Sequence, residues 1–74
     1  MAKLSQLSGR ELLQKLRKFG FEVDRVTGSH HVVRHETDSR SASVPCHGNK
    51  PLKKGTLKGI LNQLGISVDD LLDA

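Results

Sequence analysis

Residues 21–46, FEVDRVTGSHHVVRHETDSRSASVPC, decide the fold, because they contain three extended runs separated by two turns. The runs are Phe21–Val26, His30–His35 and Ser41–Cys46. Period-two alternation between clusters of glycine and polar residues is typical of β-strands joined by short connections. Gly28-Ser29 marks the first turn, and Glu36–Arg40 forms the second connection. We therefore predict a three-stranded antiparallel sheet.

The alternation also predicts which side chains share a face of this sheet. The second run divides into His30, Val32 and Arg34 on one face and His31, Val33 and His35 on the other. In the third run Pro45 has no backbone N–H to donate to a neighbouring strand. We therefore expect this strand to lie at an edge of the sheet or to end there.

A helix is predicted immediately before the first strand. Ser8-Gly9-Arg10-Glu11 is a capping box, in which the serine hydroxyl and the glutamate carboxylate can each satisfy a backbone N–H. Leu12, Leu16 and Phe19 then recur at helical spacing, and Gly20 supplies a stop. The pattern predicts a helix over residues 9–19.

A second helix is predicted after the third strand, followed by a short third one. The second carries an apolar stripe of Leu57, Ile60, Leu61 and Leu64, and Gly65 ends it. Ser67 can cap a terminal helical turn. The order α-β-β-β-α predicts an α+β fold of the double-stranded-RNA-binding-domain (dsRBD) type, a three-stranded antiparallel sheet packed against two helices.

The size and charge of the chain narrow its function. It has 74 residues, which we take as one domain over 1–74, and 12 Lys and Arg against 8 Asp and Glu, for a net charge of +4. No acidic residue occurs from Ser39 to Val68, where the basic ones are Arg40, Lys50, Lys53, Lys54 and Lys58. Such a basic block favours a polyanion such as nucleic acid, and the alternative is a solvated lysine face.

Other features exclude several classes of protein. The lone Cys46 cannot form an internal disulfide, and no run approaches the roughly 18 apolar residues of a membrane span. Residues 1–5 lack the apolar stretch of a signal peptide, so we expect a cytoplasmic protein with no membrane association. A domain this small leaves no room for an enclosed site, and we expect no small-molecule cofactor.

The histidines do not form a metal-binding pattern. His31 and His35 share a strand face but lie about 13 Å apart in an extended chain, which is too far for one metal ion. Cys46 and His47 are adjacent, which is not a chelating spacing, so we expect no metal site. His47, beside the lysine-rich loop, is either an RNA contact or an ordinary loop histidine.

Five segments together give the sequence a family resemblance. They are Ser8-Gly9-Arg10-Glu11-Leu12, Lys18-Phe19-Gly20-Phe21, Gly28-Ser29-His30-His31, Val44-Pro45-Cys46-His47 and Leu52-Lys53-Lys54-Gly55-Thr56-Leu57. In these the chain resembles the HicA family of bacterial toxins, small mRNA interferases encoded beside a HicB antitoxin. The resemblance implies a dsRBD-like fold, cleavage of mRNA that blocks translation, a HicB-type antitoxin as partner, and a catalytic histidine at His30.

The residue types at these positions also support RNA cleavage independently of the resemblance. An imidazole, with an ordinary pKa of about 6.5, can take a proton from a ribose 2′-hydroxyl without a metal ion. Gly28 lets the backbone approach a phosphate, and Ser29 offers a hydroxyl beside it. The expected phosphate contacts are Lys50, Lys53, Lys54 and Lys58, at the start of the second helix. The alternative is a double-stranded-RNA-binding module that uses the same lysines without catalysis.

Overall fold

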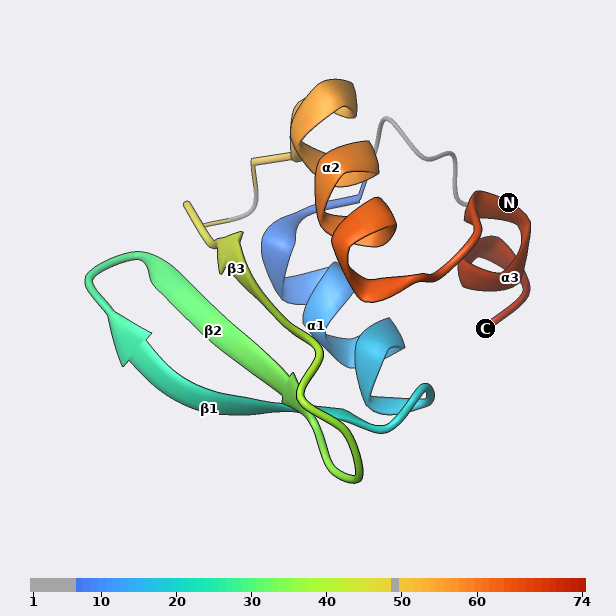
Figure 1. Ribbon diagram of the computed structural model, residues 1–74. Coiled ribbons are helices and arrows are strands. Elements are labelled where there is room, and N and C mark those ends of the chain that lie inside the picture. The colour runs from blue at the N-terminus through green and yellow to red at the C-terminus, as the bar shows by residue number, and fades with distance from the viewer. Residues whose placement is uncertain (1–6, 49) are drawn as a thin grey trace.

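The computed structural model describes residues 7–48 and 50–74, so the expectation about residues 1–5 lies outside it. Its elements are α1 (Gly9–Arg17), β1 (Phe21–Thr27), β2 (His30–His35), β3 (Ser41–Pro45), α2 (Lys54–Leu64) and α3 (Val68–Asp73) (Figure 1). The strands pair antiparallel in the order β1-β2-β3, so Pro45 lies in an edge strand as expected. The α+β fold class and the element order are confirmed, and none of the described helices is long and apolar enough to cross a membrane.

Helix α1 begins as predicted but ends earlier. The amide of Glu11 donates to Ser8 Oγ at 3.2 Å, and the amide of Ser8 donates to Glu11 Oε1 at 3.0 Å, which completes the capping box. The helix ends at Arg17, two residues before the predicted Phe19. The reason is a tightened final turn, in which the amides of residues 18–20 each bond a carbonyl three residues back before Gly20 turns the chain at φ +88°.

A two-residue turn joins β1 to β2 and fixes the start of β2. Gly28 and Ser29 lie between Thr27 and His30, which pair with each other, so β1 runs one residue beyond the predicted Val26. Gly28 has φ +59°, whereas no other residue type in the described ranges has a positive φ. A positive φ at the first central position alone is the type II′ pattern, which requires glycine there.

Helices α1 and α2 cover one face of the sheet and leave the other open, whereas α3 lies away from the sheet (Figure 1). The buried apolar side chains of the strands and helices form one core: Phe21, Val33, Ala42, Val44, Leu12, Leu16, Leu57, Ile60, Leu61, Leu64 and Leu71. Each fully buried leucine or phenylalanine contributes about 1.5–3 kcal/mol relative to exposure. The core therefore consists of the apolar stripes that the sequence predicted, and the strand ends are left for other roles.

The loop after β3 is held against the start of α1. The amide of Leu52 donates to the Leu7 carbonyl at 2.7 Å, and Ser8 forms an isolated bridge with Pro51. A Cβ atom at Gly9 would collide with the backbone of Pro45, so only glycine allows α1 to begin this close to β3. These contacts fix both ends of the loop relative to the sheet.

Candidate functional site

His30 lies at an exposed end of the central strand. It is the first residue of β2, directly after the Gly28-Ser29 turn, and it pairs with Thr27 on one side and Pro45 on the other. Its side chain is exposed, so a bound polymer could reach the imidazole without any rearrangement of the core. The strand pairing on both sides fixes its backbone.

His47 lies beside His30, although 17 residues separate the two in the chain. The two ring centroids are 6.3 Å apart and the ring planes meet at 83°. The amide of Cys46 donates to the Ser29 carbonyl at 2.7 Å, which continues the β2–β3 register beyond Pro45 and places the next residue opposite Gly28. β3 itself ends at Pro45, one residue before the predicted Cys46.

The sequence did not identify this pairing of histidines. The sequence favoured an ordinary loop histidine at His47 over an RNA contact, because only the register of β2 against β3 brings it to His30. The signal that could have found it is the hairpin itself. Pairing Val33 with Ala42 and counting outward from the connection brings Cys46 opposite Ser29.

An open hollow of about 440 Å³ adjoins His47 at this end of the molecule. Its lining comes from the end of β3, the following loop and the first turn of α2: Pro45, His47, Lys50, Pro51, Leu52, Lys53 and Thr56. We call it the basic hollow, since both of its charged lining residues, Lys50 and Lys53, are cations. His47 therefore lies between His30 and two of the four predicted phosphate-binding lysines.

The other two lysines continue along α2 and do not line the hollow. Lys54 and Lys58 are exposed and lie one helical turn apart, as their spacing predicted. Lys53 occupies the N-cap position without a side-chain cap hydrogen bond. The N-cap and first turn of α2 thus combine free backbone N–H groups with two lysines, Lys53 and Lys54, an arrangement suited to phosphate.

Gly28 and Ser29, the residues of the β1–β2 turn, have structural roles besides the phosphate contacts that the sequence predicted for them. Gly28 has no atom within 4 Å of the place where a Cβ would stand, so its φ of +59° rather than crowding requires glycine. Ser29 is half-buried, and its carbonyl holds Cys46. Their predicted contacts with a phosphate remain predictions.

The surroundings of Cys46 indicate a structural role and not that of a nucleophile. Its Sγ donates weakly to the Val44 carbonyl at 3.8 Å. Burial raises the pKa of the Cys46 thiol, and the positive charge of Arg10 partly offsets this rise. A raised pKa keeps the sulfur protonated and a poor nucleophile, in agreement with the sequence interpretation. Within residues 7–48 and 50–74, no three His, Cys, Asp or Glu side chains gather into a set that could hold a metal ion.

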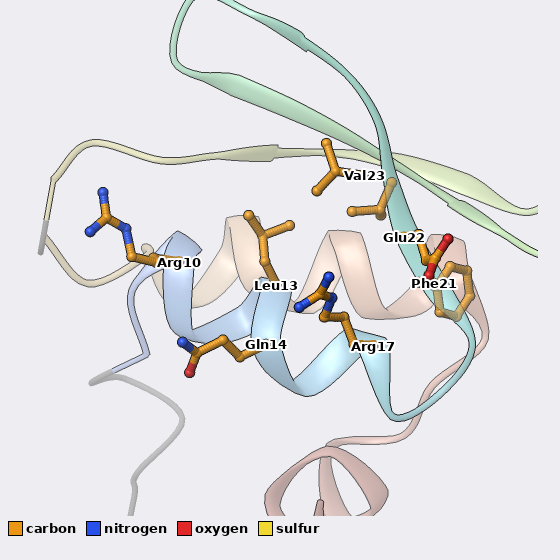
Figure 2. Close-up of a pocket in the computed structure, with 8 residues that line it drawn as sticks. Arg10, Leu13, Gln14, Arg17, Phe21, Glu22 and Val23 are labelled. Carbon is orange, nitrogen blue, oxygen red and sulfur yellow. The ribbon is translucent and has the colours of Figure 1, made fainter.

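A second hollow, of about 350 Å³, lies between α1 and β1 (Figure 2). Its lining residues are Arg10, Leu13, Gln14, Arg17, Phe21, Glu22, Val23 and Val33. Figure 2 shows Arg10 and Arg17 on the α1 side and Val23 on the strand side. None of the predicted site residues lines this groove, so the candidate site is confined to the His30 end of the sheet.

Comparison with known proteins gives one result. The family model described as the HicA toxin of bacterial toxin-antitoxin systems matches residues 9–66, which include both His30 and the whole of α2. No curated protein matches the sequence significantly.

Proposed function

The chain belongs to the HicA family of bacterial toxins, and from this premise we propose that it is a cytoplasmic endoribonuclease that cleaves mRNA, blocks translation and uses His30 as its catalytic residue. The observation that carries the proposal is the exposed imidazole of His30, whose neighbour His47 lines the basic hollow. A proton acceptor next to a phosphate-binding surface is what cleavage of an RNA backbone requires.

In the proposed reaction His30 removes the proton from a ribose 2′-hydroxyl, and that oxygen attacks the adjacent phosphorus. The O2′–P bond forms and the P–O5′ bond breaks, which leaves a 2′,3′-cyclic phosphate and, once the departing oxygen has taken up a proton, a 5′-hydroxyl end. General base catalysis of this kind contributes about 10²–10⁴-fold to the rate. The lysines stabilise the negative charge that develops on the phosphate.

The proposed RNA contacts are electrostatic rather than stacking contacts. The chain has no Trp or Tyr, and of its two phenylalanines Phe21 is buried and Phe19 packs against the core. Bases therefore have no exposed Phe, Tyr or Trp to stack on among the described residues, and we propose that binding rests on Lys50, Lys53, Lys54 and Lys58. Such contacts tolerate many sequences.

Membership of a toxin–antitoxin family implies a protein that neutralises this one. We propose a HicB-type antitoxin that covers His30 and presents acidic residues to the lysines. The site is open, so a partner can block it by coverage alone. Complementary charge would also speed the encounter of the two proteins.

The proposal is tested with purified protein and a long single-stranded RNA. We expect cleavage in the presence of EDTA, because imidazoles and ammonium groups supply the proton transfer and the positive charge. The His30→Ala variant should bind the RNA but not cleave it. Activity that disappears in EDTA and returns with Mg²⁺ would contradict the metal-independent mechanism, and RNA binding without any cleavage by the parent would favour the non-catalytic module.

A further inference from the structure

We propose that His47 is a second catalytic residue, which protonates the leaving 5′-oxygen while His30 accepts the proton of the 2′-hydroxyl. This inference rests on the proposed endoribonuclease function and goes beyond it, because it assigns the second proton transfer to a named side chain. The starting observation is the edge-to-face arrangement of the two imidazoles at the open end of the sheet.

Cleavage of RNA by its own 2′-hydroxyl involves two proton transfers at opposite sides of one phosphorus. The attacking oxygen loses a proton as the O2′–P bond forms, and the departing oxygen gains one as the P–O5′ bond breaks. The two oxygens lie in line through the phosphorus, so a single imidazole cannot serve both in one step. A site with only His30 would have to expel an alkoxide, which is a poor leaving group.

A second imidazole, that of His47, lies close enough to His30 to take part in the second transfer. The ring centroids of His30 and His47 are 6.3 Å apart, and the planes meet at 83°, so the edge of one ring faces the other ring. A catalytic group must come within about 2.6–3.2 Å of the oxygen that it serves. At this separation both rings can reach oxygens of the same phosphate group.

The assignment of acid and base follows from the charge on each side. His47 lines the basic hollow together with Lys50 and Lys53, whereas His30 lies at the turn between β1 and β2. The lysines would hold the phosphate on the side of His47. An ammonium group ordinarily titrates near 10.4 and releases its proton poorly at neutral pH, whereas an imidazolium releases it readily at about 6.5. The proton donor on that side is therefore the histidine.

The position of His47 depends on backbone contacts and not on its own side chain. The amide of Cys46 bonds the Ser29 carbonyl at 2.7 Å, and the amide of Lys50 bonds the His47 carbonyl at 3.2 Å. The side chain of His47 is exposed. A substitution at this position should therefore remove the imidazole without loss of fold.

The test compares two substrates that differ only in the leaving atom. One is an oligonucleotide with an ordinary linkage, and the other has sulfur in place of the bridging 5′-oxygen at one linkage. A thiolate leaves without protonation, so loss of the general acid should slow cleavage of the second substrate only slightly. Loss of the general base should still prevent attack on both substrates. The variants are His47→Ala, His47→Gln, His30→Ala and, as a binding control, Lys50→Ala.

We expect His47→Ala and His47→Gln to cleave the ordinary RNA about 10²–10⁴-fold more slowly than the parent and to recover most of this loss on the sulfur-containing RNA. His30→Ala should be equally inactive on both, and Lys50→Ala should show the same modest loss on both. Thermal unfolding will establish that each variant is folded.

Three results would overturn the inference. Unchanged cleavage by both His47 variants would show that the imidazole takes no part. An equal loss on the two substrates would assign His47 to RNA binding instead of proton donation. Failure of the parent to cleave either RNA would remove the proposed function, and this inference with it.

Discussion

The two ends of strand β2 carry a histidine each, and the fold treats them differently. At the far end the side chain of His35 is 14% exposed. Its ring stands edge-on to Phe21 with centroids 4.9 Å apart, and its Nδ1 accepts the amide of Thr37 at 3.2 Å and lies 3.4 Å from Asp38. At the near end His30 is exposed and has His47 as its aromatic neighbour.

Arg40 completes the enclosure of the far end. Its Nε donates to both carboxylate oxygens of Asp38 at 3.0 and 3.1 Å, and its Nη1 donates to the Leu64 carbonyl at 2.7 Å. The guanidinium also lies 5.3 Å from the centre of the Phe21 ring. The far end therefore joins the sheet to α2, whereas the near end keeps its ionisable groups available. One strand thus carries a half-buried histidine at one end and an exposed histidine at the other.

The largest expected effects come from replacing each of the two histidines in turn, and they should be opposite in kind. His30→Ala should reduce RNA cleavage by about 10²–10⁴-fold and leave the melting temperature unchanged. His35→Ala should do the reverse, with a loss of about 1–2 kcal/mol in stability and unchanged cleavage per folded molecule, because it loses its packing on Phe21. Cleavage rates and thermal unfolding of both variants check this, and equal effects on activity would remove the distinction between the two ends.

Hydrogen exchange should show that the antitoxin covers the His30 end of β2 and leaves the His35 end accessible. We expect strong protection of the backbone amides in Gly28–Val32 and Lys50–Lys58 and little change around Glu36–Arg40. His30→Ala should bind the antitoxin almost as tightly as the parent, because coverage does not depend on the imidazole. Protection confined to the far end would replace occlusion with an allosteric mechanism.

Removal of lysines should weaken RNA binding more moderately. The triple variant Lys53, Lys54, Lys58→Ala should bind RNA less tightly and reduce the salt slope by up to about 2, since each contact with single-stranded RNA contributes about 0.7. The matched control removes three exposed cations elsewhere, Lys18, Arg25 and Arg34. Binding titrations at several salt concentrations measure both. The same slope in the two variants would mean that only net charge matters.

Arg40→Ala should affect stability alone. It removes the hydrogen bond to the Leu64 carbonyl and the contact with Phe21, so we expect a loss of about 1–2 kcal/mol. For a domain of this size that is a fall of roughly 4–16 °C in melting temperature. Denaturation curves check the loss, and cleavage measured well below the transition should match the parent.

The smallest effect concerns acid stability. Hydrogen bonds from Arg40 hold the pKa of Asp38 below its ordinary value of 3.8. The contribution of this ion pair is therefore complete above that value and is lost as the pH falls through the lowered pKa of the folded state. Asp38→Asn should therefore lose less stability than the parent as the pH falls below about 4. The difference will be small because the carboxylate is exposed.

The sequence predicted those features that depend on neighbours in the chain. The capping box of Ser8 and Glu11, the strand alternation and the edge position of Pro45 are each local patterns, and each is confirmed. The end of α1 was wrong by two residues, because the spacing of Phe19 continues the helical stripe after the backbone hydrogen bonds have changed to the shorter type.

Contacts between distant segments could not be predicted in the same way. The approach of His47 to His30 depends on the register of β2 against β3, and the hydrogen bond from Arg40 to Leu64 depends on how α2 packs. The i, i+4 spacing of Lys54 and Lys58 was visible in the sequence. The sequence did not show that Lys50, Lys53 and His47 line the same hollow.

The attachment of the loop after β3 to the start of α1 has a consequence for synthesis on the ribosome. Leu7 and Ser8 emerge first, yet their backbone partners Leu52 and Pro51 emerge more than forty residues later. Translation at about 5–20 residues per second makes this a delay of seconds. The basic hollow is lined by residues as far along the chain as Thr56, so its lining is incomplete on a nascent chain until those residues have also emerged.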